Sequence, residues 1–336
     1  MKKILTLSML LVATTLFAQE EEKSALSVSG SVDAYYQTYL TAPDNEGATF
    51  GTAFAGKSGF ALGMANLIVS YEGEKVGAVL DLVTGPRGAG ATFNTDIVDG
   101  IVNQAYVYWN VSEGTTLTFG RWNTFLGYEV IAPAGNFNYS CSYLFSSGPF
   151  SHMGLKADFT LGDDFSLMLA VTNPWDTNDV SFTGEYALGA QLGYSGQFLN
   201  LYYDSGKHGG LGFEIDYTGG FDLTDSFYLG INAAYNDNDG SGFYGAALYP
   251  QIATSDDFSI GLRGEYFVLH GGPVEPSALG LTLTGSYTVE NLIIKPEIRL
   301  DSLTDATGGL YGTFINNDGV PSDSLAAFTL AAIYSF

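Results

Sequence analysis

The sequence predicts an all-β fold: a transmembrane antiparallel up-and-down β-barrel of about 16 strands, within a range of about 14 to 18. Apolar and polar residues alternate along strands of about ten residues, which is typical of a strand with one lipid face and one water face. The alternation is clearest late in the chain, where Leu279, Leu281 and Leu283 alternate with Thr282 and Thr284. No apolar run long enough for a membrane-spanning helix follows the first residues, which excludes a helical membrane protein.

The first residues have the pattern of a secretory signal peptide. Lys2 and Lys3 form a basic start, residues 4–17 are mostly apolar, and Ala18 precedes the expected cleavage site. We therefore expect residues 1–18 to be a signal peptide and residues 19–25 a short N-terminal tail. Residues 26–336 show no linker or change in composition, so we expect them to form a single transmembrane β-barrel domain.

Composition limits the classes of function. The chain has 12 basic and 36 acidic residues, and removing Lys2 and Lys3 lowers the net charge from −24 to −26. This acidic excess argues against nucleic acid as a partner, because phosphate binding needs Lys and Arg. Hydrophobic residues make up 46% of the chain, too many for a disordered protein. Cys141 is the only cysteine, so no intramolecular disulfide is expected.

Individual strands follow from the alternation. They are expected near residues 28–40, 58–72, 75–84, 100–111, 115–123, 151–161, 164–173, 184–195, 197–205, 209–218, 225–236, 242–254, 258–270, 277–289, 291–302 and 322–336.

The connections alternate between short and long. Short turns on one side and long loops on the other are typical of outer-membrane barrels, with the short turns in the periplasm. Tight turns are expected at 73–74, 112–114, 162–163, 195–196, 219–224, 255–257 and 290, and longer connections include 41–57, 85–99, 124–150, 174–183 and 303–321.

The third exterior loop, residues 124–150, is the longest connection and is rich in aromatic and amide side chains. Such a loop would expose too much apolar surface if it extended into water, so we expect it to fold into the barrel lumen. There it would form the constriction of a pore. The expected constriction residues are Arg121, Asn123, Glu129, Asn136, Asn138, Ser140, Ser142 and Tyr143.

Charged residues lie opposite the apolar face of several strands. At mid-depth on the lipid face an Arg or Lys would cost about 2–4 kcal/mol, so we expect these groups to line the lumen. They either pair with one another along a wet wall, or form a basic wall that faces Glu129 across a constriction and creates a transverse field. The expected pore-lining charges are Lys156, Asp158, Arg263, Glu265, Lys295, Glu297 and Arg299.

Acidic residues are also frequent in the long loops, for example Asp44, Asp237 and Asp318. They favour either a mild cation preference at the pore mouth or simply the solubility of exposed loops. Screening by salt limits the range of the first effect to about 8 Å.

One block of residues around the third loop carries a family resemblance. It comprises Gly120-Arg121, Thr124, Gly127-Tyr128-Glu129, Asn138-Tyr139-Ser140, Ser142-Tyr143, Phe145, Gly148-Pro149, His152 and Gly154, and the mature chain begins with the related stretch Gly30-Ser31-Val32-Asp33-Ala34-Tyr35-Tyr36. Over nearly its whole mature length the chain resembles the OmpL-like β-barrel porins of Gram-negative bacteria. The resemblance implies an outer-membrane porin and specifies no substrate. Cys141 and Met153 stand where the family often has more polar residues, so the resemblance assigns no role to Cys141.

Catalysis and metal binding find little support. Ser151 and His152 are adjacent but lack a third member of a triad, so no enzyme activity is expected. Because His152 lies in the family block, a role in locking the third loop to its strand is favoured. Residues 237–240 resemble part of a calcium loop, but Tyr235 and Ala246 occupy ligand positions, so neither a metal nor another cofactor is expected.

The functional prediction is an outer-membrane porin of a Gram-negative bacterium, a passive diffusion channel for small hydrophilic solutes. Two alternatives remain open: a channel selective for a sugar or peptide, and a structural or adhesion barrel that binds a partner through its exterior loops. The expected partners are outer-membrane lipid, the solutes, and the barrel-assembly machinery through the terminal Phe336. A homotrimer is a candidate assembly, and no nucleic acid is expected.

Overall fold

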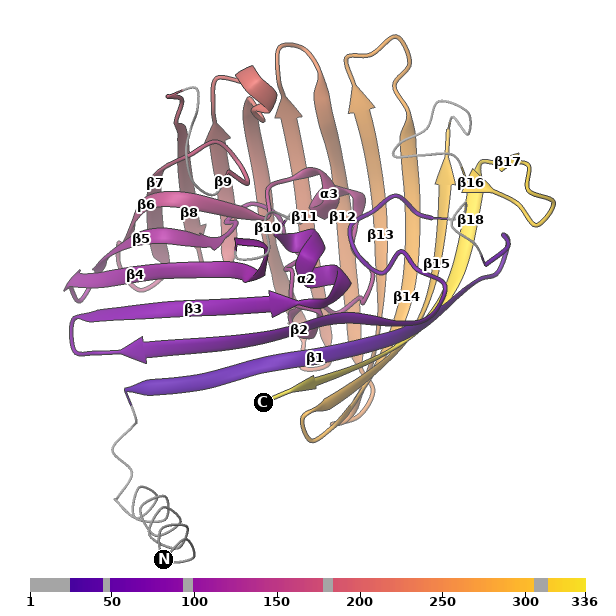
Figure 1. The fold of residues 1–336 in the computed structure, drawn as a ribbon, viewed down its shortest axis with the longest axis horizontal. Helices are drawn as coiled ribbons and strands as arrows, with labels where there is room; N and C mark the ends of the chain where they lie inside the picture. Colours follow the sequence, from indigo (N-terminus) through magenta and orange to yellow (C-terminus); the bar gives the residue numbers. More distant parts are fainter. Residues whose placement is uncertain (1–24, 45–48, 93–98, 178–183, 305–313) are drawn as a thin grey trace, which may run out of the picture.

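The computed structural model describes residues 25–44, 49–92, 99–177, 184–304 and 314–336. Within these residues, 16 antiparallel strands close into one barrel (Figure 1). The predicted antiparallel β-barrel and its number of strands are therefore confirmed. The expected signal peptide, residues 1–18, and nearly all of the tail 19–25 lie outside the described residues.

Most strand bounds lie within a few residues of those expected from the alternation. The barrel strands are β1 (Leu26–Tyr39), β2 (Gly59–Glu72), β3 (Val76–Thr84), β4 (Val102–Ser112), β5 (Thr115–Asn123), β6 (Ser151–Thr160), β7 (Phe165–Thr172), β8 (Ala187–Tyr194), β9 (Gln197–Tyr203), β10 (Phe213–Thr224), β11 (Phe227–Asp237), β12 (Gly242–Ala253), β13 (Phe258–His270), β14 (Ser277–Val289), β15 (Leu292–Leu303) and β18 (Ser324–Ser335).

The long connections carry the remaining elements. A small two-stranded sheet pairs β16 (Phe314–Ile315) with β17 (Pro321–Ser322). The helical pieces are α2 (Gly85–Ala91), η1 (Asp99–Ile101), η2 (Pro133–Gly135), α3 (Tyr143–Ser147) and η3 (Lys207–Gly209). In the described part of the chain, no helix is long and apolar enough to cross a membrane.

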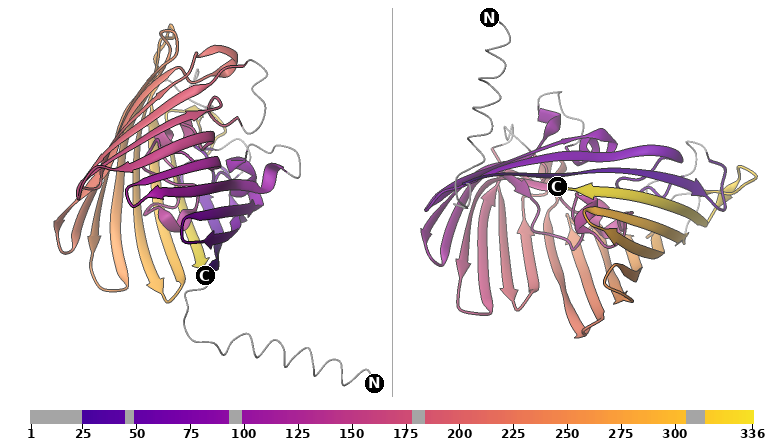
Figure 2. Two further views of the ribbon diagram at one scale, coloured as in Figure 1. Left: turned by 90° about the vertical axis from the view of Figure 1, so that its left-hand side faces the viewer. Right: turned by 90° about the horizontal axis from the view of Figure 1, so that it is seen from below.

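The barrel closes where the first strand meets the last. β1 pairs with β2 on one side and with β18 on the other, and the two strands of this seam lie side by side in Figure 2. Gly30 and Phe336 exchange two backbone hydrogen bonds of 3.0 Å across the seam. Closure satisfies the backbone groups of both edge strands, which lipid could not do.

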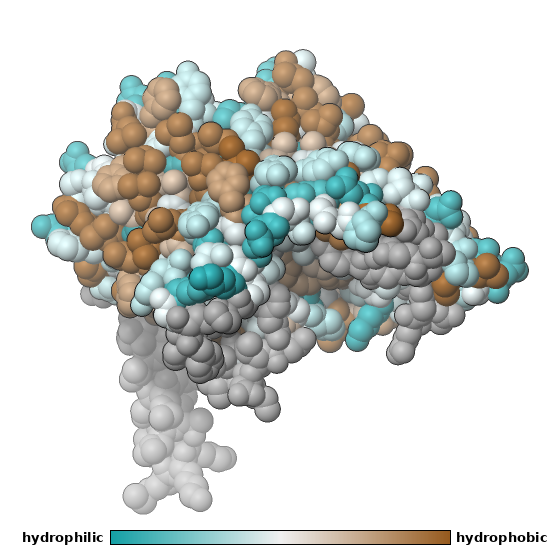
Figure 3. All heavy atoms as spheres, turned by 90° about the horizontal axis from the view of Figure 1, so that it is seen from above, coloured by the Kyte–Doolittle hydropathy of each residue, from teal (hydrophilic) through white to brown (hydrophobic). Residues whose placement is uncertain are grey.

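The two faces of the wall differ as the alternation predicts. On β14, Leu279, Leu281 and Leu283 are 41–50% exposed, whereas Thr282 and Thr284 are fully buried. Hydrophobic residues cover large parts of the outer flanks in Figure 3. The apolar side chains therefore face outward toward lipid, and the polar ones face inward.

One expected turn is wrong. Residues 219–224 were expected to turn, but β10 continues in extended form to Thr224 and only Asp225 and Ser226 separate it from β11. Gly219 and Gly220 are needed for close approach instead, because a Cβ at either position would overlap the side chain of Gln197 or Tyr228. A glycine pair inside a strand can thus make room for neighbouring side chains rather than mark a turn.

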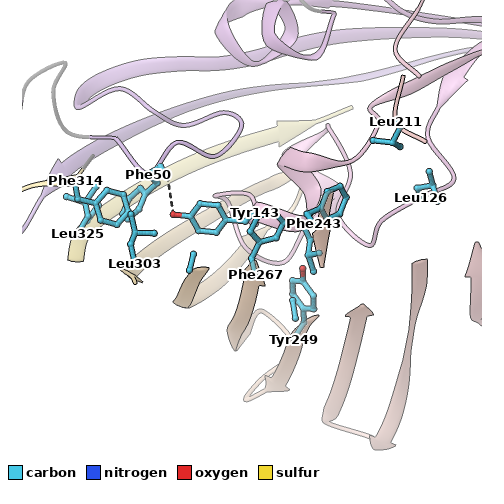
Figure 4. Close-up of a cluster of buried hydrophobic side chains, with 14 of the residues drawn as sticks. Phe50, Leu126, Tyr143, Leu211, Phe243, Tyr249, Phe267, Leu303, Phe314 and Leu325 are labelled. Carbon is cyan, nitrogen blue, oxygen red and sulfur yellow. Dashed lines mark hydrogen bonds between the residues drawn. The ribbon is translucent and has the colours of Figure 1, made fainter. Parts of the chain in front are cut away.

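The largest hydrophobic cluster forms between residues of the long loops and residues of the barrel strands. Tyr143 of α3 stacks on Phe267 of β13 with ring centroids 5.8 Å apart, and both side chains are fully buried. Phe50 in the first long connection accepts a hydrogen bond from the Tyr143 hydroxyl through its carbonyl oxygen (Figure 4). The core therefore joins loop segments to the wall and not only strand to strand.

Candidate functional site

The third loop, residues 124–150, starts at a firm attachment to β6. The Nε2 atom of His152 lies 2.9 Å from the Thr124 hydroxyl, and the imidazole stacks on Phe125 with centroids 4.8 Å apart. Asp176 accepts hydrogen bonds from the backbone N–H groups of Phe150 and Ser151 at 2.8 and 2.7 Å. These contacts tie both ends of the loop to the top of one strand.

Burial raises the pKa of the Asp176 carboxyl to about 6, although the two backbone donors favour its ionised form. Ser151 reaches Asp176 rather than His152, and His152 reaches Thr124. No catalytic Ser–His pair is formed between these two neighbours. Among the described residues, no group of three or more His, Cys, Asp or Glu side chains could hold a metal ion.

Further along the loop, Ser142 caps the short helix α3. Its hydroxyl accepts a hydrogen bond of 3.0 Å from the Phe145 N–H, which satisfies a free amide at the helix start. The same residue donates both its N–H and its hydroxyl to Oε2 of Glu129 at 2.7 Å. Glu129 therefore links the two arms of the loop.

Glu129 also pairs directly with the wall. Nη1 of Arg263 on β13 lies 2.7 Å from Oε1 of Glu129, and the two side chains are 1% and 3% exposed. One of the two alternatives from the sequence was a basic wall that faces Glu129 across a constriction, and the other was direct pairing of the charges. The structure differs from the first alternative, because two charges removed from water are stable only with close partners.

Two glutamates of the wall bind the loop backbone. Glu265 of β13 accepts hydrogen bonds from the N–H groups of Tyr143 and Leu144 at 2.9 and 2.8 Å. Glu297 of β15 accepts from the N–H groups of Tyr139 and Ser140 at 2.8 and 3.1 Å. Each carboxylate thus receives two amide donors from the loop, which are strong charge-assisted hydrogen bonds.

The basic side chains of β15 bind loop carbonyls in the complementary way. Lys295 donates to the carbonyl oxygens of Pro133, at 3.3 Å, and Asn136. Arg299 donates to the Cys141 carbonyl at 3.0 Å and pairs with Asp301 of the same strand at 2.7 Å. The wall therefore holds the main chain of the loop through charges of both signs.

Sequence reasoning missed Arg87, which lies on α2 in the second long connection. Its guanidinium donates to the carbonyls of Ile131 and Tyr139 at 3.1 and 2.9 Å and lies over the Phe54 and Tyr139 rings. The side chain is 2% exposed. Its place in a long connection concealed this role, and the one available signal was a lone arginine in a Gly- and Ala-rich segment.

Asp33 of β1 provides a further contact that was not among the expected site residues. It accepts hydrogen bonds from the Tyr139 hydroxyl at 2.6 Å and from the Met64 N–H at 2.8 Å. Gly63 is required beside it, because a Cβ there would overlap the Asp33 carboxylate. The loop is thus held at the seam as well as by β13 and β15.

The other expected loop residues have local roles. Asn136 bonds to both the N–H and the carbonyl of Val130 at 2.8 and 2.6 Å, and Asn138 donates to the Thr284 hydroxyl at 2.7 Å. Ser140 contributes its backbone to Arg263 and Glu297. Burial raises the pKa of the Cys141 thiol to about 12, so this side chain is a neutral, packed group.

Four expected residues lie apart from these contacts. Arg121 donates to the Val102 carbonyl at 2.9 Å, and the N–H of Asn123 donates to Gln104 at 3.2 Å, so both lie against β4. Lys156 and Asp158 form a pair of 2.6 Å within β6, with side chains 23% and 39% exposed. The structure does not bring these four residues to Glu129.

A cavity of about 330 Å³ lies between the loop and the half of the wall nearer the tight turns. The loop supplies one side of it and strands β11, β12, β14 and β15 supply the other. Its lining includes Tyr128, Glu129, Asn136, Phe137, Asn138, Tyr228, Tyr249, Gln251, Ser286 and Lys295.

Solved structures of outer-membrane channels share this fold. The outer membrane channel DcaP of Acinetobacter baumannii has a TM-score of 0.56 and 14% identity over 93% of this chain and 97% of its own. The anion-selective porin from Comamonas acidovorans has a TM-score of 0.58 and 12% identity over 93% and 99%. A loop L8 deletion mutant of OmpT of Vibrio cholerae has a TM-score of 0.56 and 10% identity over 93% and 99%.

At these identities the structural similarity concerns the fold alone. Among curated proteins, no sequence matches the chain. A family model described as "Putative beta-barrel porin-2, OmpL-like" matches residues 25–336, which is the whole described barrel.

Proposed function

Because this chain belongs to the OmpL-like beta-barrel porin-2 family, we propose that it is a passive diffusion channel for small hydrophilic solutes whose constriction is formed by the third loop. Family and fold place the protein in the outer membrane of a Gram-negative bacterium as a porin-type channel. They are those of channels, which supports a role in permeation rather than catalysis. The solute class, the ion preference and the role of the loop are the parts that we propose.

The proposal rests on the hydrogen bonds between charged side chains of the inner wall and the backbone of the loop. Four loop amides bind Glu265 and Glu297, and loop carbonyls bind Lys295 and Arg299. These wall residues are at most 3% exposed and lie on the face opposite the lipid-facing leucines. A loop held in this way lies across the lumen, and its contacts with β12 and β13 and the position of α3 beside β12 in Figure 1 support this placement.

A bore around the loop is consistent with the strand number. Barrels of about 16 to 18 strands enclose water, whereas about eight strands fill with side chains. A loop that occupies part of that space leaves a narrower passage, and its neutral polar groups suit hydrated solutes of many kinds. This arrangement favours a general pore over a closed adhesion barrel.

We further propose a mild cation preference. Asp44, Asp237, Asp239, Asp318 and Asp323 lie at or near the loop end of the barrel, and they outnumber Lys57, the one basic residue in the connections that carry them. Acidic groups at a pore mouth raise the local concentration of cations within about 8 Å at physiological salt. The effect should therefore shrink as the salt concentration rises.

Two partners remain predictions. Phe336 is 52% exposed at the end of β18, which suits recognition of a terminal aromatic residue by the barrel-assembly machinery. A homotrimer is the second prediction. Chemical crosslinking of the refolded protein in detergent would test it.

Refolded mature protein in planar bilayers tests the proposed function. We expect single-channel current steps, and in a KCl gradient a reversal potential of the sign for K⁺ over Cl⁻, larger at low salt than at high salt. A folded barrel that inserts but never conducts would contradict the channel. A reversal potential of the opposite sign would leave the channel and remove the cation preference.

A further inference from the structure

The cavity between the third loop and the turn-side wall contains an unusual basic group. Three buried basic side chains extend inward from β13 and β15, and two of them have a carboxylate at 2.7 Å: Arg263 with Glu129 and Arg299 with Asp301. Lys295 forms no ion pair among the described residues. It is also the one of the three that lines the cavity.

The hydrogen bonds of Lys295 leave one donor available. An ammonium carries three N–H donors, and Pro133 and Asn136 accept two of them through neutral carbonyls. The side chain is only 2% exposed. A buried charge without a counter-charge is costly, so a carboxylate placed in this cavity would be stabilised there.

The carboxylate of Glu129 does not fill this role. It also lines the cavity, but Arg263 binds its Oε1 and Ser142 binds its Oε2. The cavity therefore contains one neutralised acidic group and one ammonium that has no carboxylate at ion-pair distance among the described residues. Its electrostatic bias is toward a negatively charged guest.

Tyr249 adds a second polar group to the lining of the cavity. Its side chain is 2% exposed, and its hydroxyl lies near the side chain of Ser142. Its ring stacks on Tyr128 with centroids 4.4 Å apart, and the Tyr128 hydroxyl donates to that of Tyr228 at 3.4 Å. Stacked rings with hydroxyls at their edges can contact both the C–H face and the hydroxyls of a sugar ring.

We propose that this cavity is a binding subsite for small polyhydroxylated carboxylates, the class of sugar acids. Lys295 would bind the carboxylate, Tyr249 and Gln251 would bind hydroxyls, and Phe137 and the stacked tyrosines would cover the ring. The subsite rests on the proposed function, because the solute reaches it through the channel. The acidic loop residues lie at the opposite end of the strands, so the two features act at different depths.

The test compares D-glucuronate with uncharged D-glucose as blockers of single-channel current through the refolded protein. We expect glucuronate to interrupt the current at lower concentration than glucose. K295Q should raise the half-blocking concentration of glucuronate by about tenfold or more, since a charge-assisted hydrogen bond is lost. K156Q, which removes a lysine that already has Asp158 as a partner, should leave this concentration unchanged.

Two further variants separate a folding defect from a loss of binding. K295R keeps the positive charge and should retain most of the preference for glucuronate. Y249F removes only the hydroxyl and should weaken block by both sugars by about two- to tenfold. Equal block by glucose and glucuronate, or an unchanged response of correctly folded K295Q, would overturn the subsite.

Calorimetric titration of the detergent-solubilised barrel separates the subsite from the channel. Glucuronate binding that K295Q abolishes would support the subsite even if the barrel did not conduct. Normal conductance together with no glucuronate binding would overturn the subsite and leave the proposed channel in place.

Discussion

Charged side chains on two parts of the inner wall differ in their exposure and in their partners. On β6, Lys156 and Asp158 bind one another at 2.6 Å and are 23% and 39% exposed. On β13 and β15, Arg263, Glu265 and Glu297 are at most 2% exposed and bind the third loop. The charges on β6 are partnered within one strand, whereas Arg263, Glu265 and Glu297 depend on a segment distant in sequence.

This difference shows that the loop and the part of the wall formed by β13 and β15 stabilise one another. Without the loop, Glu265 and Glu297 would lose four amide donors and Arg263 would lose Glu129. Without the wall, the loop would lose the partners of the same backbone groups. Breaking the contact on either side should therefore cost much more than a change on β6.

The largest effect is expected from R263A. Removing one partner leaves Glu129 buried and charged, which typically costs about 3–5 kcal/mol. We expect a lower denaturant midpoint for the detergent-refolded barrel and faster proteolysis within residues 129–141. The variant R263M/E129M removes both charges and should recover most of the loss. Unchanged proteolysis in R263A would contradict a loop held by this pair.

An intermediate effect, visible as a pH dependence, is expected from D176N. Burial raises the pKa of Asp176 from 3.8 to about 6 in the folded protein, so between these values the folded state binds more protons than the unfolded state. The contribution of Asp176 to stability is therefore present below pH 3.8 and declines as the pH rises through 6.

The matched measurement is the denaturant midpoint of the wild-type protein and of D176N across this range. The variant keeps one oxygen as an acceptor for Phe150 and Ser151 and removes the ionisation. We expect the difference between the two midpoints to vary with pH between 4 and 6 and to be constant above about 7. A constant difference over the whole range would show that Asp176 does not titrate there.

The smallest effect is expected from K156Q on β6. A partly exposed ion pair contributes about 0–1 kcal/mol to the free energy of unfolding, because water already solvates both groups. The denaturant midpoint and the proteolysis pattern of the loop should match the wild type. A loss as large as that of R263A would mean that the two parts of the wall do not differ in the way we infer.

Much of the fold could be predicted from the sequence, because side-chain alternation alone determines which face of a strand meets lipid. Leu279 to Thr284 illustrate this, with leucines outside and threonines inside. The prediction failed at Gly219 and Gly220, where the residue type suggested a turn but the requirement was space for Gln197 and Tyr228. Close approach between strands is a three-dimensional property that a linear pattern does not contain.

Less of the candidate site could be predicted. The sequence identified Glu129, Arg263, Glu265 and Glu297 as residues of one region, but not that the glutamates bind loop amides. Backbone N–H and C=O groups are the same at nearly every position, so no residue pattern marks the ones that serve as partners. Arg87 was missed for the same reason, since its hydrogen bonds go to backbone carbonyls.

Recognition of the main chain has a consequence for how this channel could diversify. Between Tyr139 and Leu144 most of the anchoring contacts use peptide groups, which every substitution except proline preserves. A side chain such as that of Ser140, whose backbone makes the contacts to Arg263 and Glu297, can then be exchanged while the segment keeps its path. Evolution or engineering can therefore change which solutes pass the channel by exchanging loop side chains, while the backbone of the loop stays in place.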